Sequence, residues 1–154
     1  MKRPNWQTYF LGMTDYIATR SNCSRRAFGA VIVDKENQIV TTGYNGTPKG
    51  VKNCFDGGCA RCESGIEAGE DYDACGCVHS EANAITQAGY SRTSGATLYV
   101  SGRPCFFCLK MIIQARIMRV VYYDDGPMIQ DEKVEKEYWS MVGQVGLVMV
   151  DVIR

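Results

Sequence analysis

Helix-like and strand-like segments alternate through the second half of the chain, and this alternation limits the fold more than any other feature. Apolar residues recur at helical spacing over about 79–88, 105–115 and 130–143. Between and after these segments lie short runs rich in β-branched and aromatic residues, at 96–102, 118–124 and 147–153. Strands that alternate with helices indicate an α/β layered fold.

The first 44 residues add a helix and a hairpin. The segment 5–20 carries aromatic and aliphatic residues at helical spacing directly after Pro4, which suits a helix start. Two apolar runs at 28–34 and 38–44 flank the turn sequence DKEN and predict a β-hairpin. A hairpin combined with strand–helix–strand units requires both kinds of strand pairing, so we expect an α/β fold with a mixed sheet.

Residues 45–77 differ from the rest of the chain. They are rich in glycine and cysteine and show no hydrophobic period. Such a long loop inside a compact domain is usually functional or held by something other than a core. The length of 154 residues suits one domain, and no repeat or linker marks a boundary. We therefore expect a single domain over 1–154 with a Cys-rich loop insertion at about 45–77.

The composition argues against several classes of function. Lys plus Arg and Asp plus Glu number 17 each, so the chain lacks the basic excess of domains that grip nucleic acid by charge alone. A run of about eighteen apolar residues, which a membrane span needs, is absent. The opening MKRPNWQTYF lacks the apolar core of a signal peptide, so we expect a cytoplasmic protein. There, eight cysteines are better explained as metal ligands or thiols than as disulfides.

The single histidine, His79, stands two residues before Glu81, and the sequence PCFFC follows at 104–108. Taken alone, a lone histidine is more often structural, and two cysteines among phenylalanines are more often core residues. Considered together they indicate a site. His79 and Glu81 open one predicted helix. Cys105 and Cys108 open another, and both N-termini, which favour thiolates, can meet at one edge of the sheet.

One nitrogen and two thiolates make three zinc ligands, the number that catalytic zinc sites use while leaving the fourth position to water. Zinc lowers the pKa of such a water from 15.7 toward about 7. A carboxylate two residues past the histidine need not bind the metal, and it can carry the proton to a substrate. The pattern H-x-E with P-C-x-x-C is the signature of zinc nucleobase deaminases. The expected metal ligands are His79, Cys105 and Cys108, and the expected catalytic residue is Glu81.

The stretches HSEANAI, GRPCFFC and FGAVIV…TTGYNGTPKG resemble the cytidine deaminase-like superfamily, and within it the deoxycytidylate (dCMP) deaminases. The metal motif belongs to the superfamily, whereas GYNG-x-P-x-G narrows the resemblance to dCMP deaminases. It covers nearly the whole chain up to about Tyr122. The resemblance implies a three-layer α/β/α fold with a five-stranded central sheet, and hydrolysis of dCMP to dUMP and ammonia for thymidylate synthesis. Implied substrate contacts are Asn45, Ser80, Arg26 and Tyr122.

Two departures from the family pattern leave the substrate open. Ser80 stands where most relatives have alanine, a position whose backbone N–H is expected to meet the pyrimidine. After VVYY the family typically has a further tyrosine near the substrate phosphate, whereas this chain has DDGPMIQDE. Two acids there are unfavourable for a monophosphate. Either Arg25, Arg26 or Lys49 supplies the positive charge, or the substrate is another cytosine nucleotide, such as dCTP or a 5-substituted dCMP.

Six further cysteines are candidates for a second, structural zinc, because five of them fall in the Cys-rich loop with C-x2-C and C-x-C pairs. A closed zinc site takes four ligands. The simplest local set is Cys54, Cys59, Cys62 and Cys75. The pattern of some relatives would instead recruit Cys23, Cys54, Cys75 and Cys77. The sequence does not choose between the two sets, and it predicts more than one zinc per chain.

The resemblance also implies a regulatory nucleotide site, with dCTP as activator, dTTP as inhibitor and Mg²⁺, in a homohexamer. The candidate residues are Gly46, Lys49 and Arg25, although Asn-Gly after a strand is also an ordinary turn. Base editing of nucleic acid is disfavoured by zero net charge and by the lack of a basic stretch interleaved with aromatic residues. A zinc-stabilised interaction module without catalysis is the remaining alternative, and it would tolerate Glu81→Gln.

Overall fold

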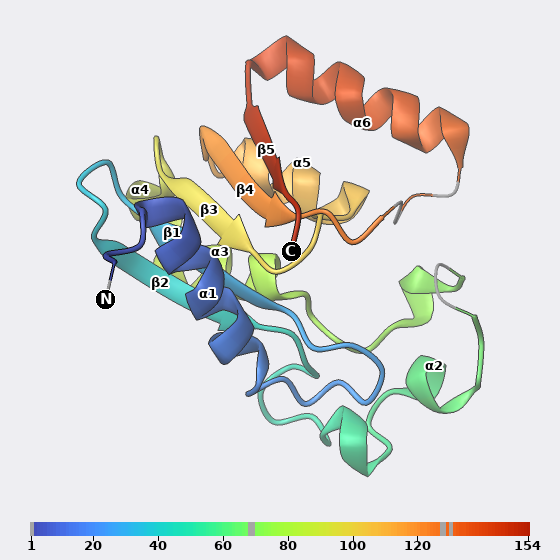
Figure 1. Ribbon diagram of the computed structural model, residues 1–154. Coiled ribbons are helices and arrows are strands. Elements are labelled where there is room, and N and C mark those ends of the chain that lie inside the picture. The colour runs from blue at the N-terminus through green and yellow to red at the C-terminus, as the bar shows by residue number, and fades with distance from the viewer. Residues whose placement is uncertain (1, 68–69, 127–128, 130) are drawn as a thin grey trace.

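A five-stranded sheet lies at the centre of the computed structural model, which describes residues 2–67, 70–126, 129 and 131–154 (Figure 1). The strands are β1 (Gly29–Val33), β2 (Ile39–Tyr44), β3 (Thr97–Val100), β4 (Arg119–Tyr123) and β5 (Val148–Val152). Their order is β2-β1-β3-β4-β5. β1 pairs antiparallel with β2 and β3, while β4 pairs parallel with β3 and β5. The expected mixed sheet of five strands is confirmed.

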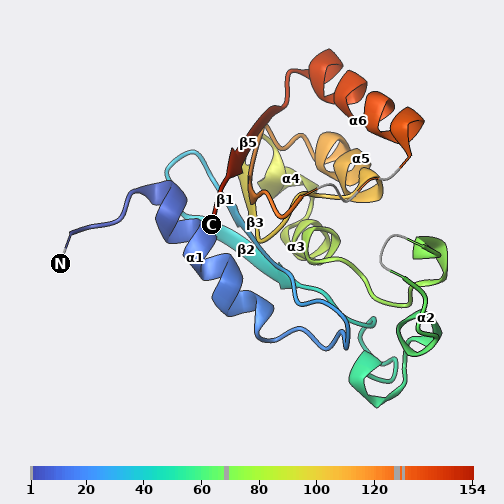
Figure 2. The ribbon, with the colours of Figure 1, turned by 45° about the vertical axis from the view of Figure 1, so that its right-hand side comes forward.

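Helices cover both faces of this sheet (Figure 2). The helix α1 (Trp6–Ala18) lies on one face. On the other lie α3 (Ser80–Ala88), α5 (Phe106–Gln114) and α6 (Glu132–Val145). The three-layer arrangement is therefore confirmed. None of the helices in the described part of the chain is both long enough and apolar enough to cross a membrane.

The interior strand β1, which lies between β2 and β3, explains how one sheet holds two helix layers. All five of its residues are buried, and successive side chains of a strand point to opposite faces. Ala30 and Ile32 join the core cluster beneath α3, α5 and α6, whereas Val31 and Val33 join the cluster that includes Phe10 of α1. A strand covered on both faces must be apolar throughout, as this one is.

Most elements lie within a few residues of their expected positions, and the differences are local. The helix α3 ends at Ala88 with Gly89 as its C-cap, as expected, and a short helix that was not expected, α4 (Tyr90–Thr93), follows it. The helix expected over 130–143 begins at Glu132, and residue 130 lies outside the described residues. The side chain of Asp131 caps this helix by accepting from the backbone N–H groups of Lys133 and Val134.

The Cys-rich segment is not irregular throughout. It contains three short helical turns, η1 (Cys54–Asp56), α2 (Ala60–Glu63) and η2 (Tyr72–Ala74). Its two ends are joined by an isolated bridge between Gly46 and Val78, with N···O distances of 3.1 and 2.8 Å. The segment therefore leaves the end of β2 and returns beside the same point, one residue before His79.

The start of α3 is held against β2 at Gly43. A Cβ atom on this glycine would lie 2.2 Å from the carbonyl oxygen of Ser80 and 2.6 Å from the nitrogen of Ala84. Only a residue without a side chain lets the two backbones approach so closely. Because His79 is the N-cap residue of α3, this contact also fixes the position of the imidazole.

Substitution of Gly43 by alanine tests this contact. We expect Gly43→Ala to lower the free energy of unfolding by about 1–3 kcal/mol or more, because the methyl group overpacks the interface between α3 and β2. Urea denaturation measures the change. The matched control is Gly12→Ala in α1, where a Cβ atom meets nothing within 4 Å and alanine should stabilise the helix by about 0.5–1 kcal/mol. Equal unfolding midpoints for the two variants would contradict the assignment.

Candidate functional site

The N-termini of α3 and α5 meet, and they bring one imidazole and two thiols together. His79 is the N-cap residue of α3 and Cys105 is that of α5. Nδ1 of His79 lies 3.4 Å from Sγ of Cys105 and 3.4 Å from Sγ of Cys108. Tetrahedral zinc, with bonds of ~2.3 Å to sulfur and ~2.0 Å to nitrogen, separates these atoms by about 3.6 Å. The three residues therefore fit a single zinc ion, whose preferred donors they also supply.

The pKa values of the two thiols in this triad are shifted in opposite directions. Contact with the Cys108 thiol, together with the His79 imidazole, lowers the pKa of Cys105 to about 4. Contact with Cys105 and burial raise the pKa of Cys108 above its ordinary range. The backbone N–H of Cys108 also points at Sγ of Cys105, at 3.5 Å, as expected where a helix N-terminus stabilises a thiolate. One ligand of the triad is therefore already favoured as an anion.

Glu81 lies one residue into α3 and is 6% exposed. Burial raises the pKa of its carboxyl group, an effect that the neighbouring His79 partly offsets. The hydroxyl of Ser80, itself fully buried, donates to Oε2 of Glu81 at 3.0 Å. A carboxyl group with a raised pKa beside a metal triad is suited to accept a proton and return it near neutral pH.

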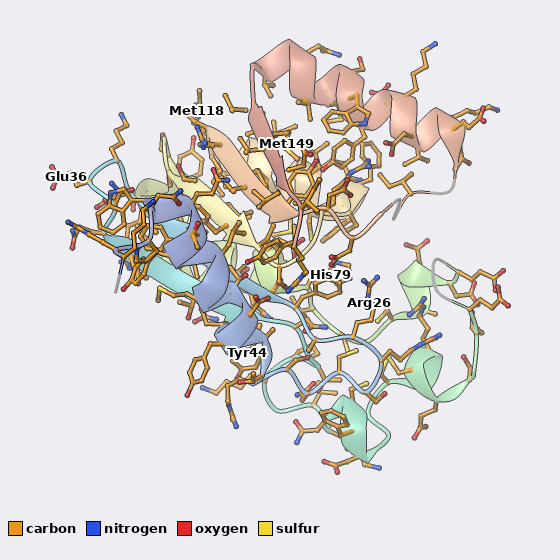
Figure 3. All side chains as sticks on the ribbon, in the orientation of Figure 1. Arg26, Glu36, Tyr44, His79, Met118 and Met149 are labelled. Atoms are coloured by element: carbon orange, nitrogen blue, oxygen red, sulfur yellow. The ribbon has the colours of Figure 1, made fainter. Side chains whose placement is uncertain are left out.

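Two residues of the triad and the glutamate open into a cavity of about 230 Å³ whose other walls include four arginines and four cysteines. His79, Glu81 and Cys105 line it together with four arginines, Arg25, Arg26, Arg61 and Arg103. Figure 3 shows His79 and Arg26 on the side of the sheet that faces the Cys-rich segment. Four guanidinium groups around one small cavity favour an anionic ligand, above all a phosphate or a carboxylate.

Two of these arginines each have one buried nitrogen without a hydrogen-bond partner among the described residues. Nη1 of Arg25 and Nε of Arg103 are buried and make no hydrogen bond within the described residues. Arg103 is held from α6, because it donates to Glu135 and lies 4.7 Å from the ring centroid of Tyr138. The C-terminal helix thus positions a cation at the cavity.

Residues 4–124 match the family model described as the cytidine and deoxycytidylate deaminase zinc-binding region. The chain belongs to this family. A deoxycytidylate deaminase of Schizosaccharomyces pombe is 45% identical over 122 residues, and the match spans 79% of this chain but only 38% of that protein. The deoxycytidylate deaminase of Mycobacterium phage D29 is 43% identical over 127 residues, 79% of this chain and 97% of that protein. Among solved structures, the dCMP deaminase of cyanophage S-TIM5 in complex with dCMP and dUMP has a TM-score of 0.70 at 25% identity, covering 99% of this chain and 100% of that one.

In this chain Asn45 lines the cavity, but its amide is already in use. Oδ1 of Asn45 accepts from the backbone N–H of Phe28, and Nδ2 donates to the carbonyl of Arg26, both at 2.8 Å. The side chain therefore fixes the loop that carries Arg25 and Arg26 to the cavity. Asn45 has spare hydrogen-bonding capacity for a ligand, yet its first role in the structure is to hold this wall.

The other residues expected from the family resemblance are divided. The hydroxyl of Ser80 donates to Glu81, and Arg25 and Arg26 both line the cavity. Tyr122 is packed in the core cluster beneath α5 and α6 instead of at the cavity. Gly46 pairs with Val78, and Lys49 is exposed. Arg61 and Arg103 were not predicted from the sequence. Arg61 lies inside the C-x2-C pair at 59–62 and Arg103 directly precedes PCFFC, and neither belongs to a spacing pattern of its own.

The six remaining cysteines form one cluster beside the same cavity, and all eight cysteines are free. Two groups have Sγ atoms within 4.8 Å of one another, namely Cys23, Cys54, Cys62 and Cys77, and Cys59, Cys62, Cys75 and Cys77. Neither set expected from the sequence is one of these groups. The groups depend on tertiary structure, which the spacing of cysteines in the sequence does not show. Cys23 lies in the segment after α1, and Cys62 lies in α2 near Cys77.

Replacement of Asn45 separates a structural role from a ligand contact. We expect Asn45→Ala to lower the free energy of unfolding by about 2–4 kcal/mol without any ligand, because two part-buried backbone groups, of Arg26 and Phe28, lose their partners. Asn83→Ala is the control, since Asn83 makes a single, more exposed hydrogen bond to the carbonyl of Tyr44 and should cost about 0.5–1.5 kcal/mol. Wild-type stability of Asn45→Ala in urea would mean that the side chain serves only the ligand.

Proposed function

We propose that this chain is a zinc-dependent dCMP deaminase that hydrolyses dCMP to dUMP and ammonia, feeding thymidylate synthesis, and that residues 1–154 act as one domain. The observation that carries the proposal is a single cavity that joins a His-Cys-Cys triad, a buried glutamate and four arginines. The proposal is supported by relatives described as deoxycytidylate deaminases and by the cyanophage enzyme in complex with dCMP and dUMP.

In this mechanism His79, Cys105 and Cys108 hold the metal. Zinc bound there would act as a Lewis acid that lowers the pKa of water toward about 7. It would thereby supply a nucleophile for C4 of cytosine at neutral pH. Glu81 would accept one proton of the attacking water on its carboxylate and pass it to N3; it would then take the second proton from the oxygen added at C4 and give it to the amino group, so that ammonia leaves. Ser80 holds Oε2 of Glu81 during this transfer. The buried position of Glu81 excludes bulk water from the proton path.

Recognition of a nucleotide rather than a nucleoside follows from charge. Arg25, Arg26, Arg61 and Arg103 all line the cavity, and their positive charge favours a phosphate there. The acidic pair in DDGPMIQDE does not oppose this, because Asp125 lies 3.4 Å from Arg154 and neither Asp124 nor Asp125 lines the cavity. Residues 127, 128 and 130 of that stretch lie outside the described residues.

Alternative substrates differ in size and charge. Four arginines also suit dCTP, and a 5-substituted dCMP places its extra group on the ring, so both stay as second candidates. A nucleic-acid substrate would need an extended basic groove with aromatic platforms, whereas the arginines here converge on a cavity of about 230 Å³. The non-enzymatic interpretation gives no role to a buried Glu81 held by Ser80.

Assembly and regulation extend the proposal to a cytoplasmic homohexamer that dCTP activates and dTTP inhibits, with Mg²⁺ accompanying the effector. Eight free thiols suit a reducing compartment. The exposed aromatic residues of α1, Trp6, Tyr9 and Tyr16, give the apolar surface that subunit contacts bury. Of the effector candidates, Lys49 alone has an exposed side chain clear of the substrate cavity.

A substrate panel tests the function. The purified chain is offered cytidine, deoxycytidine, dCMP, dCTP, 5-methyl-dCMP and a short single-stranded DNA, with and without dCTP or dTTP, and ammonia release is followed. We expect the highest kcat/KM for dCMP, and a loss of about 10²–10⁴ in kcat for Glu81→Gln with zinc retained. Glu132→Gln, an exposed carboxylate of α6, should turn over like the wild type. Activity on DNA alone, or an unimpaired Glu81→Gln, would refute the proposal.

The Ser80 hydroxyl provides a finer test. A hydrogen bond to the carboxylate favours its ionised form, so Ser80→Ala should raise the pKa of Glu81. Because Glu81 must be ionised to accept a proton, the acidic limb of the kcat/KM profile on dCMP should move to higher pH while the zinc content stays constant. Ser140→Ala on α6, whose hydroxyl accepts only from Gln144 among the contacts of the described residues, should leave the profile in place. An unmoved profile for Ser80→Ala would remove Ser80 from the mechanism.

A further inference from the structure

The two four-cysteine groups beside the cavity overlap. In the first group, the Sγ atoms of Cys23 and Cys62 are 4.0 Å apart, and in the second those of Cys59 and Cys75 are 4.0 Å apart. Tetrahedral zinc with bonds of ~2.3 Å separates its sulfur ligands by about 3.8 Å. Disulfide bonding would instead bring two sulfurs to about 2.05 Å. One pair in each group is therefore close to the spacing of a closed zinc site, and the other Sγ atoms of each group lie within 4.8 Å of one another.

Cys62 and Cys77 belong to both groups. Two separate tetrathiolate sites would need eight cysteines, but Cys105 and Cys108 belong to the triad and six remain. Both groups can be filled together only when two sulfurs serve both ions. Cys62 has the contacts that this requires, because it meets Cys23 of the first group and lies within hydrogen-bonding reach of Cys59 of the second.

We propose that the six cysteines bind two zinc ions as one cluster, in which Cys62 and Cys77 bridge both ions and the other four cysteines each bind one. Cys23 and Cys54 complete the first ion, and Cys59 and Cys75 complete the second. All-sulfur tetrahedral sets of this kind favour zinc over harder metals.

The two halves of the cluster are prepared in the same way. The backbone N–H of Ser24 points at Sγ of Cys54 at 3.4 Å, and that of Gly76 points at Sγ of Cys59 at 3.3 Å. Both acceptors are cysteines that would bind one ion only. Such sulfurs keep more negative charge than bridging ones, and hydrogen bonds from N–H groups stabilise that charge. If only one zinc ion were bound, one of these two hydrogen-bonded thiolates would have no metal ion beside it.

The packing of the Cys-rich segment also favours metal binding by these cysteines. The core cluster under the Cys-rich segment consists of Cys54, Cys59 and Cys77, with the half-buried Cys23, Cys62 and Cys75 against it. The described residues contribute no aliphatic side chain to this cluster, so the hydrophobic effect has little to hold the segment together. Metal–thiolate bonds supply that folding energy in other domains that lack a core.

The cluster is also part of the active-site cavity. Its lining includes Cys23, Cys62, Cys75 and Cys77. Two zinc ions and six thiolates leave a net charge of about −2, and Arg25 and Arg61 face the same space. The metal pair therefore forms a wall of the cavity, and its charge helps to hold the arginines that would meet a phosphate.

Metal analysis tests the count. The full chain, purified with zinc under reducing conditions, should contain three zinc ions by mass spectrometry of the metal, one in the triad and two in the cluster. Cys105→Ser should contain two. A wild-type content of two zinc ions, or iron with the visible absorption of an iron–sulfur centre, would overturn the proposal.

Ligand substitutions test the sharing. Cys62→Ser removes a bridging sulfur and should lose two zinc ions, whereas Cys23→Ser and Cys75→Ser each remove a ligand of one ion and should lose one. X-ray absorption at the zinc edge of the wild type needs no variant to fold, and it should show zinc–zinc scattering at roughly 3 Å, as two tetrahedra that share an edge require. Equal losses from Cys62→Ser and Cys23→Ser, or no such scattering, would exclude a shared cluster. None of these readouts depends on turnover, so a chain with three zinc ions and no deaminase activity would count against the proposed function alone.

Discussion

The approach of the His79 imidazole to the two sulfurs of α5 depends on where two helices begin, and the rest of the site is arranged around it. Each residue added to a helix turns the next side chain by about 100°, so a shift of one residue in either start would point the donors apart. Gly43 sets one start by letting α3 touch β2, and Asn83 ties the same helix to the end of that strand. The turn between β3 and α5 sets the other by placing Cys105 as the cap.

Charge is the second constraint. The chain has no net charge, yet the cavity gathers four arginines around a buried glutamate and several thiols. Composition reports the sum of the charges and says nothing of their local field, which decides what binds. The arginines come from three separate parts of the chain, with Arg25 and Arg26 before β1, Arg61 in α2, and Arg103 before α5. Only the folded chain brings them together, and α6 then holds Arg103 through Glu135.

What could be predicted from the sequence is what local spacing determines. The sheet, the hairpin and the triad follow from periods of two and of 3.6 residues and from motifs within single turns, and the structure places them as expected. The directions of the Asn45 and Tyr122 side chains could not be predicted, because a motif gives residue types and not the direction in which a side chain points. Asn45 turns its amide to the backbone, and Tyr122 turns into the core. The two predicted cysteine sets were wrong for a related reason. Cys62 and Cys77 come together through the course of a loop that has no hydrophobic period, so no sequence pattern indicates that they are close.

This path changes how the Cys-rich segment should be understood. The sequence suggests an insertion, which a domain could lose, but the segment begins and ends at the bridge between Gly46 and Val78, with Asn45 just before it and His79 just after it. Only Val78 separates the proposed bridging ligand Cys77 from His79, the expected ligand of the other centre. Metal binding at one centre then restricts the backbone that the other centre needs, so the affinities of the two centres for zinc are coupled. Such coupling is reciprocal, and zinc in the triad should stabilise the cluster as much as the cluster stabilises the triad.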